Sequence, residues 1–413
     1  MDILRFITAG SVDDGKSTLI GRLLYDSKSI LVDQLEALEK QSKNKNADGI
    51  DLAILTDGLR AEREQGITID VAYRYFATPK RKFIIADAPG HIQYTRNMIT
   101  GASNSQLIII LVDARNGVIE QTKRHSIIAS LLKMKHIVVA INKMDLVDYS
   151  QEAFENIKKD YEEVAQRLGL ENVEYFPISA FNGDNIVEKS ERMSWYEGSS
   201  LLDYLENVQV ADDVDYDNAR FQVQFVIRPQ TEELHDYRGY SGHIISGTYK
   251  KGDRITILPQ NIETTISKVE TGGVEVAEVF AQQPAVIHIE DDIDISRGDY
   301  FVKSDNLPRV ENEIEAVICW LDKKELNEGN KYLIQHKSKL VRAIVKEIEY
   351  RIDVNTLEQT PVSDSVKLNE VVKVKIKTAQ PLVFDSFAEN NATGSAILVD
   401  ETSHSTVGAV MFI

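Results

Sequence analysis

One loop near the N-terminus constrains the fold of this chain more than any other feature. The apolar run Leu4 to Ala9 leads directly into Gly10-Ser11-Val12-Asp13-Asp14-Gly15-Lys16-Ser17, and a helical pattern follows from Lys16 to Asp26. A G-x-x-x-x-G-K-[ST] loop between a strand and a helix is typical of phosphate binding, because backbone N–H groups and the helix N-terminus can surround the anion. A plain glycine-rich turn is the alternative interpretation. The strand and helix on either side favour the phosphate loop.

Two residues of this loop have expected chemical roles. In loops of this kind the lysine ammonium contacts the β and γ phosphates, and the hydroxyl that follows it ligates Mg²⁺. We therefore expect Lys16 to act on the phosphates and Ser17 to bind the metal.

A second motif, Asp87-Ala88-Pro89-Gly90-His91, follows the apolar run Lys82 to Ala86. A carboxylate at the carboxyl end of a strand beside the phosphate loop can hold Mg²⁺, directly or through water. Gly90 can bring its N–H against a γ-phosphate, and His91 lies where a residue that orients an attacking water is needed. By itself such a segment is more often a turn. Its order and spacing after the phosphate loop favour the functional interpretation.

A third motif, Asn142-Lys143-Met144-Asp145, closes the apolar run Ile137 to Ile141. A carboxylate that accepts two hydrogen bonds distinguishes guanine, whose N1–H and exocyclic amine are donors, from adenine. Asp145 is the expected base reader, while Asn142 would support the loop and the Lys143 stem would lie along the base. Ser179-Ala180, after another apolar run, offers a backbone N–H to the guanine carbonyl. Each of these two segments alone is a weak signal.

The order of apolar runs predicts the architecture. In the first half, short apolar runs alternate with helical patterns, which predicts a mainly parallel sheet with helices on both faces. An acidic, unpatterned stretch follows Val210, and strand patterns continue from Arg220 with a second break near residues 305–309. We predict an α/β domain over residues 1–208, followed by two all-β barrel domains over residues 218–306 and 310–413.

Composition indicates in which cell compartment the protein is expected and which partners are not expected. The net charge of −18 provides no broad basic field of the kind that proteins bound to DNA carry. The longest aliphatic run, Leu107 to Val112, is far shorter than the roughly 18 residues that cross a bilayer. The N-terminus has no signal-peptide pattern, and Cys319 is the single cysteine, which excludes an internal disulfide. We expect a cytoplasmic protein with neither membrane nor DNA as a partner.

Taken in this order, the motifs resemble the GTP-binding fold of P-loop GTPases. Within Glu62-Arg63-Glu64-Gln65-Gly66-Ile67-Thr68-Ile69-Asp70, Thr68 matches the switch threonine that closes on Mg²⁺ and the γ-phosphate. By the same resemblance Thr18 belongs with the nucleotide-binding loop. The E-R-E-x-G-I-T stretch, the D-A-P-G-H form and the two barrels are similar to the translation-factor branch of these GTPases.

The first loop differs from that of most translation factors. Most translation factors read G-H-V-D-H-G-K in the first loop, whereas this chain has Ser11 and Asp14 at the two histidine positions. Together with the segments Thr56 to Phe76 and His91 to Ser103, this loop closely resembles the GTPase subunits of bacterial sulfate adenylyltransferase. The resemblance covers essentially the whole chain. Ala88 and Ile92 stand where we expected threonine and an acidic residue, which affects local switch contacts and not the nucleotide site.

The resemblance implies a GTPase that uses GTP and Mg²⁺, with Lys16, Thr68 and His91 as its catalytic residues. It also implies a partner, the small catalytic subunit of ATP sulfurylase, in a heterodimer or larger heteromer. That partner would make adenosine 5′-phosphosulfate and pyrophosphate from ATP and sulfate, driven by GTP hydrolysis in this chain. The chain has no second nucleotide loop of the Ser-Gly-Gly-x-Asp-Ser type. Some relatives carry a fused adenylylsulfate kinase, and because this chain stops at Ile413 we expect it to lack that activity.

Two alternative functions remain. A GTPase that delivers aminoacyl-tRNA is similar in domain order, but Ser11, Asp14 and the Thr56 to Phe76 segment argue against tRNA as a partner. A nucleotide-independent scaffold disagrees with the intact Lys16 and Asp145.

Weaker candidates lie in the barrels. Asp291-Asp292 with Asp294 could bind a cation, although a β-turn is the favoured interpretation. A basic stretch could contact a partner or RNA, with a solvated strand face as the default; it consists of Lys331, Lys337, Lys339, Arg342 and Lys346. Trp195 and Trp320 are expected to be packing residues.

Overall fold

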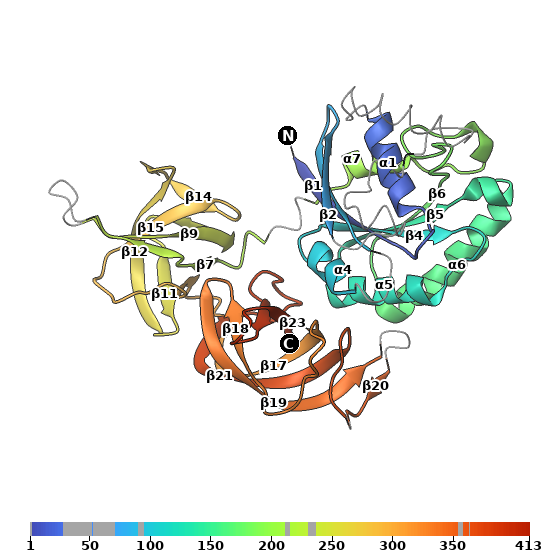
Figure 1. The fold of residues 1–413 in the computed structure, drawn as a ribbon. Coiled ribbons are helices and arrows are strands. Elements are labelled where there is room, and N and C mark those ends of the chain that lie inside the picture. The colour runs from blue at the N-terminus through green and yellow to red at the C-terminus, as the bar shows by residue number, and fades with distance from the viewer. Residues whose placement is uncertain are drawn as a thin grey trace. The chain divides into compact units, whose positions relative to one another are not determined.

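A computed structural model describes residues 2–27, 52, 71–89, 95–210, 215–229, 237–353, 358–362 and 364–413. The chain divides into two compact units, one of residues 1–210 and one of residues 211–353 and 358–413 (Figure 1). Among the described residues, no helix is both long and apolar enough to cross a membrane.

The first unit is a six-stranded sheet in the order β2-β3-β1-β4-β5-β6, and only β2 runs antiparallel to its neighbour. Its elements are β1 (Ile3–Ala9), α1 (Lys16–Asp26), β2 (Ala72–Ala77), β3 (Lys82–Asp87), α4 (Thr95–Ala102), β4 (Leu107–Asp113), α5 (Glu120–Leu131), β5 (His136–Asn142), η3 (Met144–Val147), α6 (Gln151–Leu168), β6 (Val173–Pro177), η4 (Glu191–Met193) and α7 (Leu201–Asn207). The predicted mainly parallel α/β domain is confirmed.

Burial on both faces explains the apolar runs of this sheet. All seven residues of β4 are buried, as expected for a parallel strand covered by helices on both sides. Phe6 and Ile109 pack in one core cluster with Leu23 of α1 and Leu205 of α7. Figure 1 shows α4, α5 and α6 on the other side of the sheet from α1 and α7.

Capping residues set both ends of α6, which runs from Gln151 to Leu168. The Ser150 hydroxyl accepts a hydrogen bond from the Ala153 N–H at 3.2 Å, and Gly169 ends the helix in the left-handed region at φ 60°.

The second unit contains two closed antiparallel barrels, as predicted. The first barrel closes in the order β11-β16-β7-β9-β15-β12 through the β11–β12 pairing, and the second in the order β18-β22-β23-β17-β21-β19 through the β18–β19 pairing. The first barrel sheet contains β7 (Arg220–Gln222), β8 (Phe225–Ile227), β9 (Gly239–Ser246), β11 (Arg254–Leu258), β12 (Ile262–Thr271), β13 (Val274–Glu275), β15 (Pro284–Ile289) and β16 (Tyr300–Lys303). Beside it, β10 (Thr248–Lys250) and β14 (Glu278–Phe280) pair with each other in a two-stranded sheet. The second barrel contains β17 (Arg309–Trp320), β18 (Lys331–His336), β19 (Lys339–Ile352), β20 (Gln359–Thr360), β21 (Val371–Phe384), β22 (Ser395–Val399) and β23 (Thr406–Phe412).

The alternation from Phe221 to Ile227 does not form one continuous strand. The chain breaks between β7 and β8, where the Val223 N–H donates to Asp299 and the Gln224 N–H donates to Ser241. Phe221 is fully buried, whereas Phe225 is 66% exposed. The alternation of apolar residues predicted strand conformation correctly. It could not show that the apolar residues after the break no longer face the core of the barrel.

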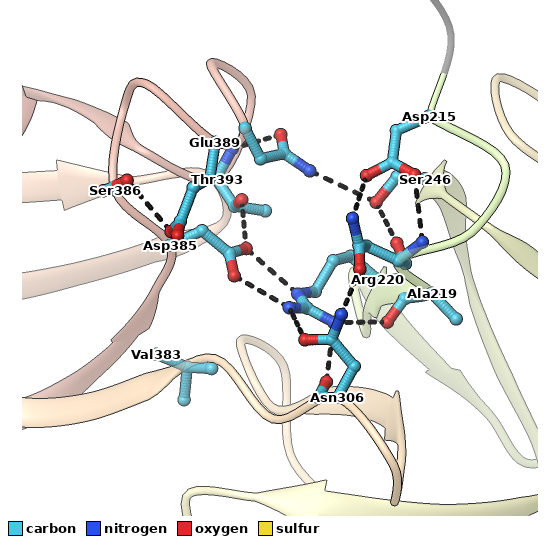
Figure 2. Close-up of polar contacts among 12 residues, drawn as sticks. Asp215, Ala219, Arg220, Ser246, Asn306, Val383, Asp385, Ser386, Glu389 and Thr393 are labelled. Carbon is cyan, nitrogen blue, oxygen red and sulfur yellow. Dashed lines mark hydrogen bonds and ion pairs between the residues drawn. The ribbon is translucent and has the colours of Figure 1, made fainter.

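Polar and apolar contacts join the two barrels within the second unit. The Arg220 guanidinium of β7 donates to both carboxylate oxygens of Asp385, at 2.9 and 2.8 Å, and to the Asn306 carbonyl at 3.0 Å (Figure 2). The Thr393 hydroxyl also donates to Asp385 at 2.5 Å. A small apolar cluster accompanies these bonds, made of Leu258, Tyr300, Val302 and Val383.

Candidate functional site

The phosphate loop, Gly10–Ser17, connects β1 to α1, and its backbone leaves the helix N-terminus open to an anion. Gly15 caps α1 in the left-handed region at φ 93°, and α1 has neither a side-chain cap nor an acidic residue in its first turn. The first N–H groups of the helix therefore keep their capacity to bind an anion. A Cβ at Gly15 would collide with the Asn142 amide. Glycine is required there for its backbone conformation and for space.

Lys16 is buried beneath the loop. Its ammonium donates to the carbonyls of Gly10 at 2.8 Å and Ser11 at 2.7 Å. Burial lowers the pKa of Lys16, while the nearby Asp87 and Asp14 carboxylates oppose that shift. An ammonium has three N–H donors, so a bond to a phosphate oxygen can be added while both carbonyls stay bound. This arrangement suits the phosphate role predicted for Lys16.

Oxygen donors of the predicted metal site lie at adjoining element ends. Asp87 is the last residue of β3 and pairs in register with Thr8 of β1, the strand that runs into the phosphate loop. Ser17 lies in the first turn of α1. A carboxylate and a hydroxyl fit Mg²⁺, which prefers oxygen ligands and commonly takes only one or two from the protein. Within the described ranges, no group of three or more His, Cys, Asp or Glu side chains could hold a metal ion.

Asn142 joins the phosphate loop to the segment after β6. This last residue of β5 is 1% exposed. Its amide Nδ2 donates to the Asp14 carbonyl at 2.7 Å, and its Oδ1 accepts from the Ala180 N–H at 2.9 Å. One side chain thereby connects three motifs that are 128 and 38 residues apart in the sequence.

Asp145, the predicted base reader, is held by a hydrogen bond from the segment after β6. The Ser179 hydroxyl donates to Asp145 Oδ1 at 2.6 Å, and the Met144 N–H donates to the Ile178 carbonyl at 3.2 Å. These bonds tie the segment after β5 to the segment after β6. The predicted residues Asn142, Asp145, Ser179 and Ala180 are therefore brought together at the carboxyl ends of neighbouring parallel strands.

Asp113 supplies a carboxylate that positions Lys143, and none of the sequence motifs included it. Asp113 ends β4 and lies beside Asn142 in the parallel register. Its carboxylate accepts two bonds from Arg115, at 3.0 and 2.7 Å, and pairs with the Lys143 ammonium at 3.0 Å. Burial raises the pKa of Asp113, but the bonds from Arg115 and Lys143 outweigh burial and hold it well below its ordinary value. A polar residue at the end of an apolar strand was the available signal.

Arg22 was also missed, and no sequence pattern marks it. This α1 residue donates through Nε to the Ala180 carbonyl at 3.2 Å and through Nη2 to the Phe181 carbonyl. It thus braces the loop after β6 from the helix that begins at the phosphate loop. His125 of α5 is buried, and burial together with the nearby Lys16 charge lowers its pKa to about 3, so it is neutral.

The remaining predicted site residues are placed as follows. Thr68, Gly90 and His91 lie outside the described residues. Val12 and Asp13 are exposed, Ser11, Ser17 and Thr18 are half-buried, and Ala88 and Pro89 are buried after β3.

The weaker barrel candidates have partners of their own. Asp291 accepts from the Thr264 hydroxyl at 2.7 Å, and Asp292 pairs with Arg238. In the basic stretch, Lys346 pairs with Glu313 at 3.2 Å and Arg342 with Glu401 at 3.3 Å. The two ion pairs agree with the solvated strand face that was the favoured interpretation of the basic stretch, and the β-turn at Asp291 to Asp294 stays a prediction.

The two tryptophans have the packing roles that were expected. Trp320 is fully buried in the core of the second barrel, and Trp195 packs against Phe154 at 5.4 Å between ring centres.

Comparison with known proteins adds independent findings. A family profile described as the elongation factor Tu GTP binding domain matches residues 1–214, and one described as GTP-eEF1A C-terminal domain-like matches residues 313–413. The sulfate adenylyltransferase subunit 1 of Pseudoalteromonas atlantica is 51% identical over 414 residues, covering 100% of this chain and 87% of that protein. The same subunit of Cellvibrio japonicus is 50% identical over 415 residues, with the same coverage. The bifunctional enzyme CysN/CysC of Mycobacterium tuberculosis is 51% identical, covering 100% of this chain and 67% of that protein.

About half of the positions are thus identical in alignments that span the full length of the chain. The chain belongs to the sulfate adenylyltransferase subunit 1 family, whose N-terminal part is a GTP-binding domain of the elongation factor Tu type.

Proposed function

We propose that this protein is the GTP-hydrolysing regulatory subunit of a sulfate adenylyltransferase. It couples GTP hydrolysis to the synthesis of adenosine 5′-phosphosulfate and pyrophosphate from ATP and sulfate, which a separate catalytic subunit carries out. The observation that carries the proposal is the Asn142 side chain, which joins the phosphate loop to the guanine-binding segments in a chain about 50% identical to subunit 1 proteins.

The described residues support each part of nucleotide binding. The open N-terminus of α1 and the Lys16 ammonium are suited to the phosphates, and Asp145 is suited to the two donors of guanine. When bound, Mg²⁺ would neutralise charge between the β and γ phosphates, with Ser17 and Asp87 as its protein partners here. The Lys16 ammonium stabilises the negative charge that develops as the γ-phosphoryl group transfers to water. Thr68 and His91 keep the switch and water-orienting roles proposed from their motifs.

A separate catalytic subunit follows from the proposed function. The curated relatives are named as a subunit of sulfate adenylyltransferase, so we propose a heteromeric complex in which the partner forms adenosine 5′-phosphosulfate. We place this complex in the cytoplasm. The buried, unpaired thiol of Cys319 suits a reducing compartment, and burial raises its pKa to about 12, so it stays an unreactive thiol.

The proposal predicts that product formation needs both the partner and a working GTP site. We expect no adenosine 5′-phosphosulfate from ATP and sulfate with the isolated chain, and GTP-stimulated synthesis when the catalytic subunit of the same organism is added. Lys16→Ala should remove the stimulation, because the β and γ phosphates lose a buried ammonium. The measurement is product formed with and without GTP in the reconstituted complex.

A matched control is Lys159→Ala, which removes an exposed lysine from α6 and should keep the GTP stimulation. Synthesis by the isolated chain, or synthesis by the complex that ignores GTP, would contradict the proposal. GTP-dependent binding of aminoacyl-tRNA would instead favour a delivery protein.

A further inference from the structure

Asp14 places a carboxylate inside a loop that is built for anions. The residue is 4% exposed, and its Oδ2 accepts the Ser11 N–H at 2.5 Å. Its own backbone is also held, because the Asp14 N–H donates to the Ser11 carbonyl at 3.3 Å and its carbonyl accepts from the Asn142 amide. The carboxylate therefore has one fixed place in the loop.

Two side chains of opposite charge hold Ser11 from its two sides. The Asp14 carboxylate accepts from the N–H of Ser11, and the Lys16 ammonium donates to its carbonyl at 2.7 Å. Gly10 leaves room for this arrangement, because a Cβ there would lie 3.2 Å from Asp14 Oδ2 and 3.1 Å from Leu111 Cβ. The chain's own charged side chains thus hold the first half of the phosphate loop.

The same carboxylate opposes the ligand. A nucleoside diphosphate or triphosphate would bring several negative charges to the loop, and repulsion between buried like charges is screened little by water or salt. Burial raises the pKa of Asp14, with the Ser11 bond and the Lys16 charge acting in the other direction. The side chain therefore contributes a favourable bond to the loop and an unfavourable charge to nucleotide binding.

We propose that Asp14 is a positioning residue that forms the phosphate loop in advance through Ser11, and that its charge lowers the affinity of the site for guanine nucleotides. This inference rests on the proposed function, because it assumes that GTP and GDP bind in this loop. Through its charge, Asp14 also raises the rate at which bound guanine nucleotide dissociates.

Two substitutions separate the hydrogen bond from the charge. Asp14→Asn keeps an oxygen acceptor for the Ser11 N–H and removes the charge, so the purified chain should bind GDP and GTP at least about tenfold more tightly and release them more slowly. Asp14→Ala removes both, so its affinity should fall well below that of Asp14→Asn. Equilibrium titration and stopped-flow release of a fluorescent guanine nucleotide measure these effects, and thermal unfolding without nucleotide checks that each variant is folded.

Asp13→Asn is the matched comparison, because it removes the same charge from the neighbouring exposed side chain. Its gain in affinity should be smaller and should shrink as salt is raised, whereas the gain from Asp14→Asn should persist. An Asp14→Asn variant that binds no more tightly than the parent would overturn the role of the charge. Equal affinities for Asp14→Ala and Asp14→Asn would overturn the positioning role, and equal gains from Asp13→Asn and Asp14→Asn would overturn the assignment to Asp14.

Failure of this inference can be told apart from failure of the proposed function. Nucleotide binding by the purified chain requires neither the catalytic subunit nor sulfate. A parent protein that binds no guanine nucleotide would contradict the proposed function itself. A parent that binds GTP while Asp14→Asn leaves the affinity unchanged would contradict only the inference about Asp14.

Discussion

Individual buried side chains in the nucleotide-binding unit each hold two partners. Asn142 bonds to the phosphate loop and to Ala180, and Lys16 bonds to two loop carbonyls. A buried polar group that loses its partner costs about 1 to 3 kcal/mol, so a substitution at these positions affects the shape of the site as well as its chemistry. A conservative change that keeps one bond and alters the other is the most informative test.

Asp145→Asn is such a change. The amide oxygen can still accept the Ser179 hydroxyl, which lies 2.6 Å from Oδ1, so the loop should keep its place. The amide N–H₂ is a donor where the carboxylate was an acceptor, and it matches the carbonyl that xanthine carries in place of the guanine amine. Competition between GTP and XTP should shift toward XTP, and a variant that still selects GTP by the margin of the parent would show that Asp145 does not read the base.

At the scale of elements, one buried histidine of β18 contacts residues of three other strands, which belong to both barrels. His336 of β18 bonds through Nδ1 to the Ser395 carbonyl at 2.9 Å, and through Nε2 it contacts the Val383 carbonyl and the Tyr300 hydroxyl at 3.0 and 3.1 Å. Burial lowers the pKa of His336 to about 4, although both carbonyls act to raise it. The ring is therefore neutral in the folded protein at neutral pH.

This burial predicts a loss of stability in acid. The unfolded chain binds a proton at His336 near its ordinary pKa of 6.5, whereas the folded chain does so only near 4. Stability is thus fully present above pH 6.5 and falls as the pH drops toward 4, by about 2 kcal/mol at pH 5. Urea unfolding at pH 7 and pH 5 should show that His336→Gln reduces the loss and that His404→Gln, an exposed control, does not. An equal loss in parent and His336→Gln would assign the acid sensitivity to other groups.

At the scale of the whole molecule, the chain is organised as one nucleotide-binding unit and one unit of two joined barrels. The Arg220–Asp385 pair crosses between the barrels with side chains that are only 3% and 9% exposed (Figure 2). Removing one partner of a buried pair leaves the other charge uncompensated, which costs about 3 to 5 kcal/mol. We infer that this pair makes the two barrels unfold together.

Asp385→Ala should therefore split or broaden the calorimetric unfolding transition of the barrels and lower their stability by about 3 to 5 kcal/mol. Glu263→Ala is the control, because it breaks an ion pair with Arg254 whose side chains are 77% and 59% exposed. Exposed pairs contribute about 0 to 1 kcal/mol, so this variant should unfold almost as the parent does. Indistinguishable transitions for Asp385→Ala and Glu263→Ala would contradict the inferred role of the buried pair.

The sequence by itself did not indicate β2 or α7, but it determined the phosphate loop, the alternation of apolar strands and helices in the first unit, and the presence of two barrels. These features follow from short-range patterns: apolar period, turn residues and the spacing of Lys16 and Ser17 within one loop. The family resemblance was also carried by local segments, and it is confirmed by relatives about 50% identical over the whole chain. The strand break at Val223 and Gln224 was not predictable, because it depends on partners that lie far away in the chain.

Only the tertiary structure decided which distant side chains complete the site and join the barrels. Asn142 reaches Asp14, Arg22 braces the Ala180 carbonyl, and Asp113 holds Lys143. Each of these contacts depends on parallel strand register or on the approach of a helix to a loop, and neither is encoded by local spacing. Arg220 and Asp385 are 165 residues apart in the sequence. Long-range pairs of this kind form only when packing buries both groups, and burial makes a pairing partner necessary.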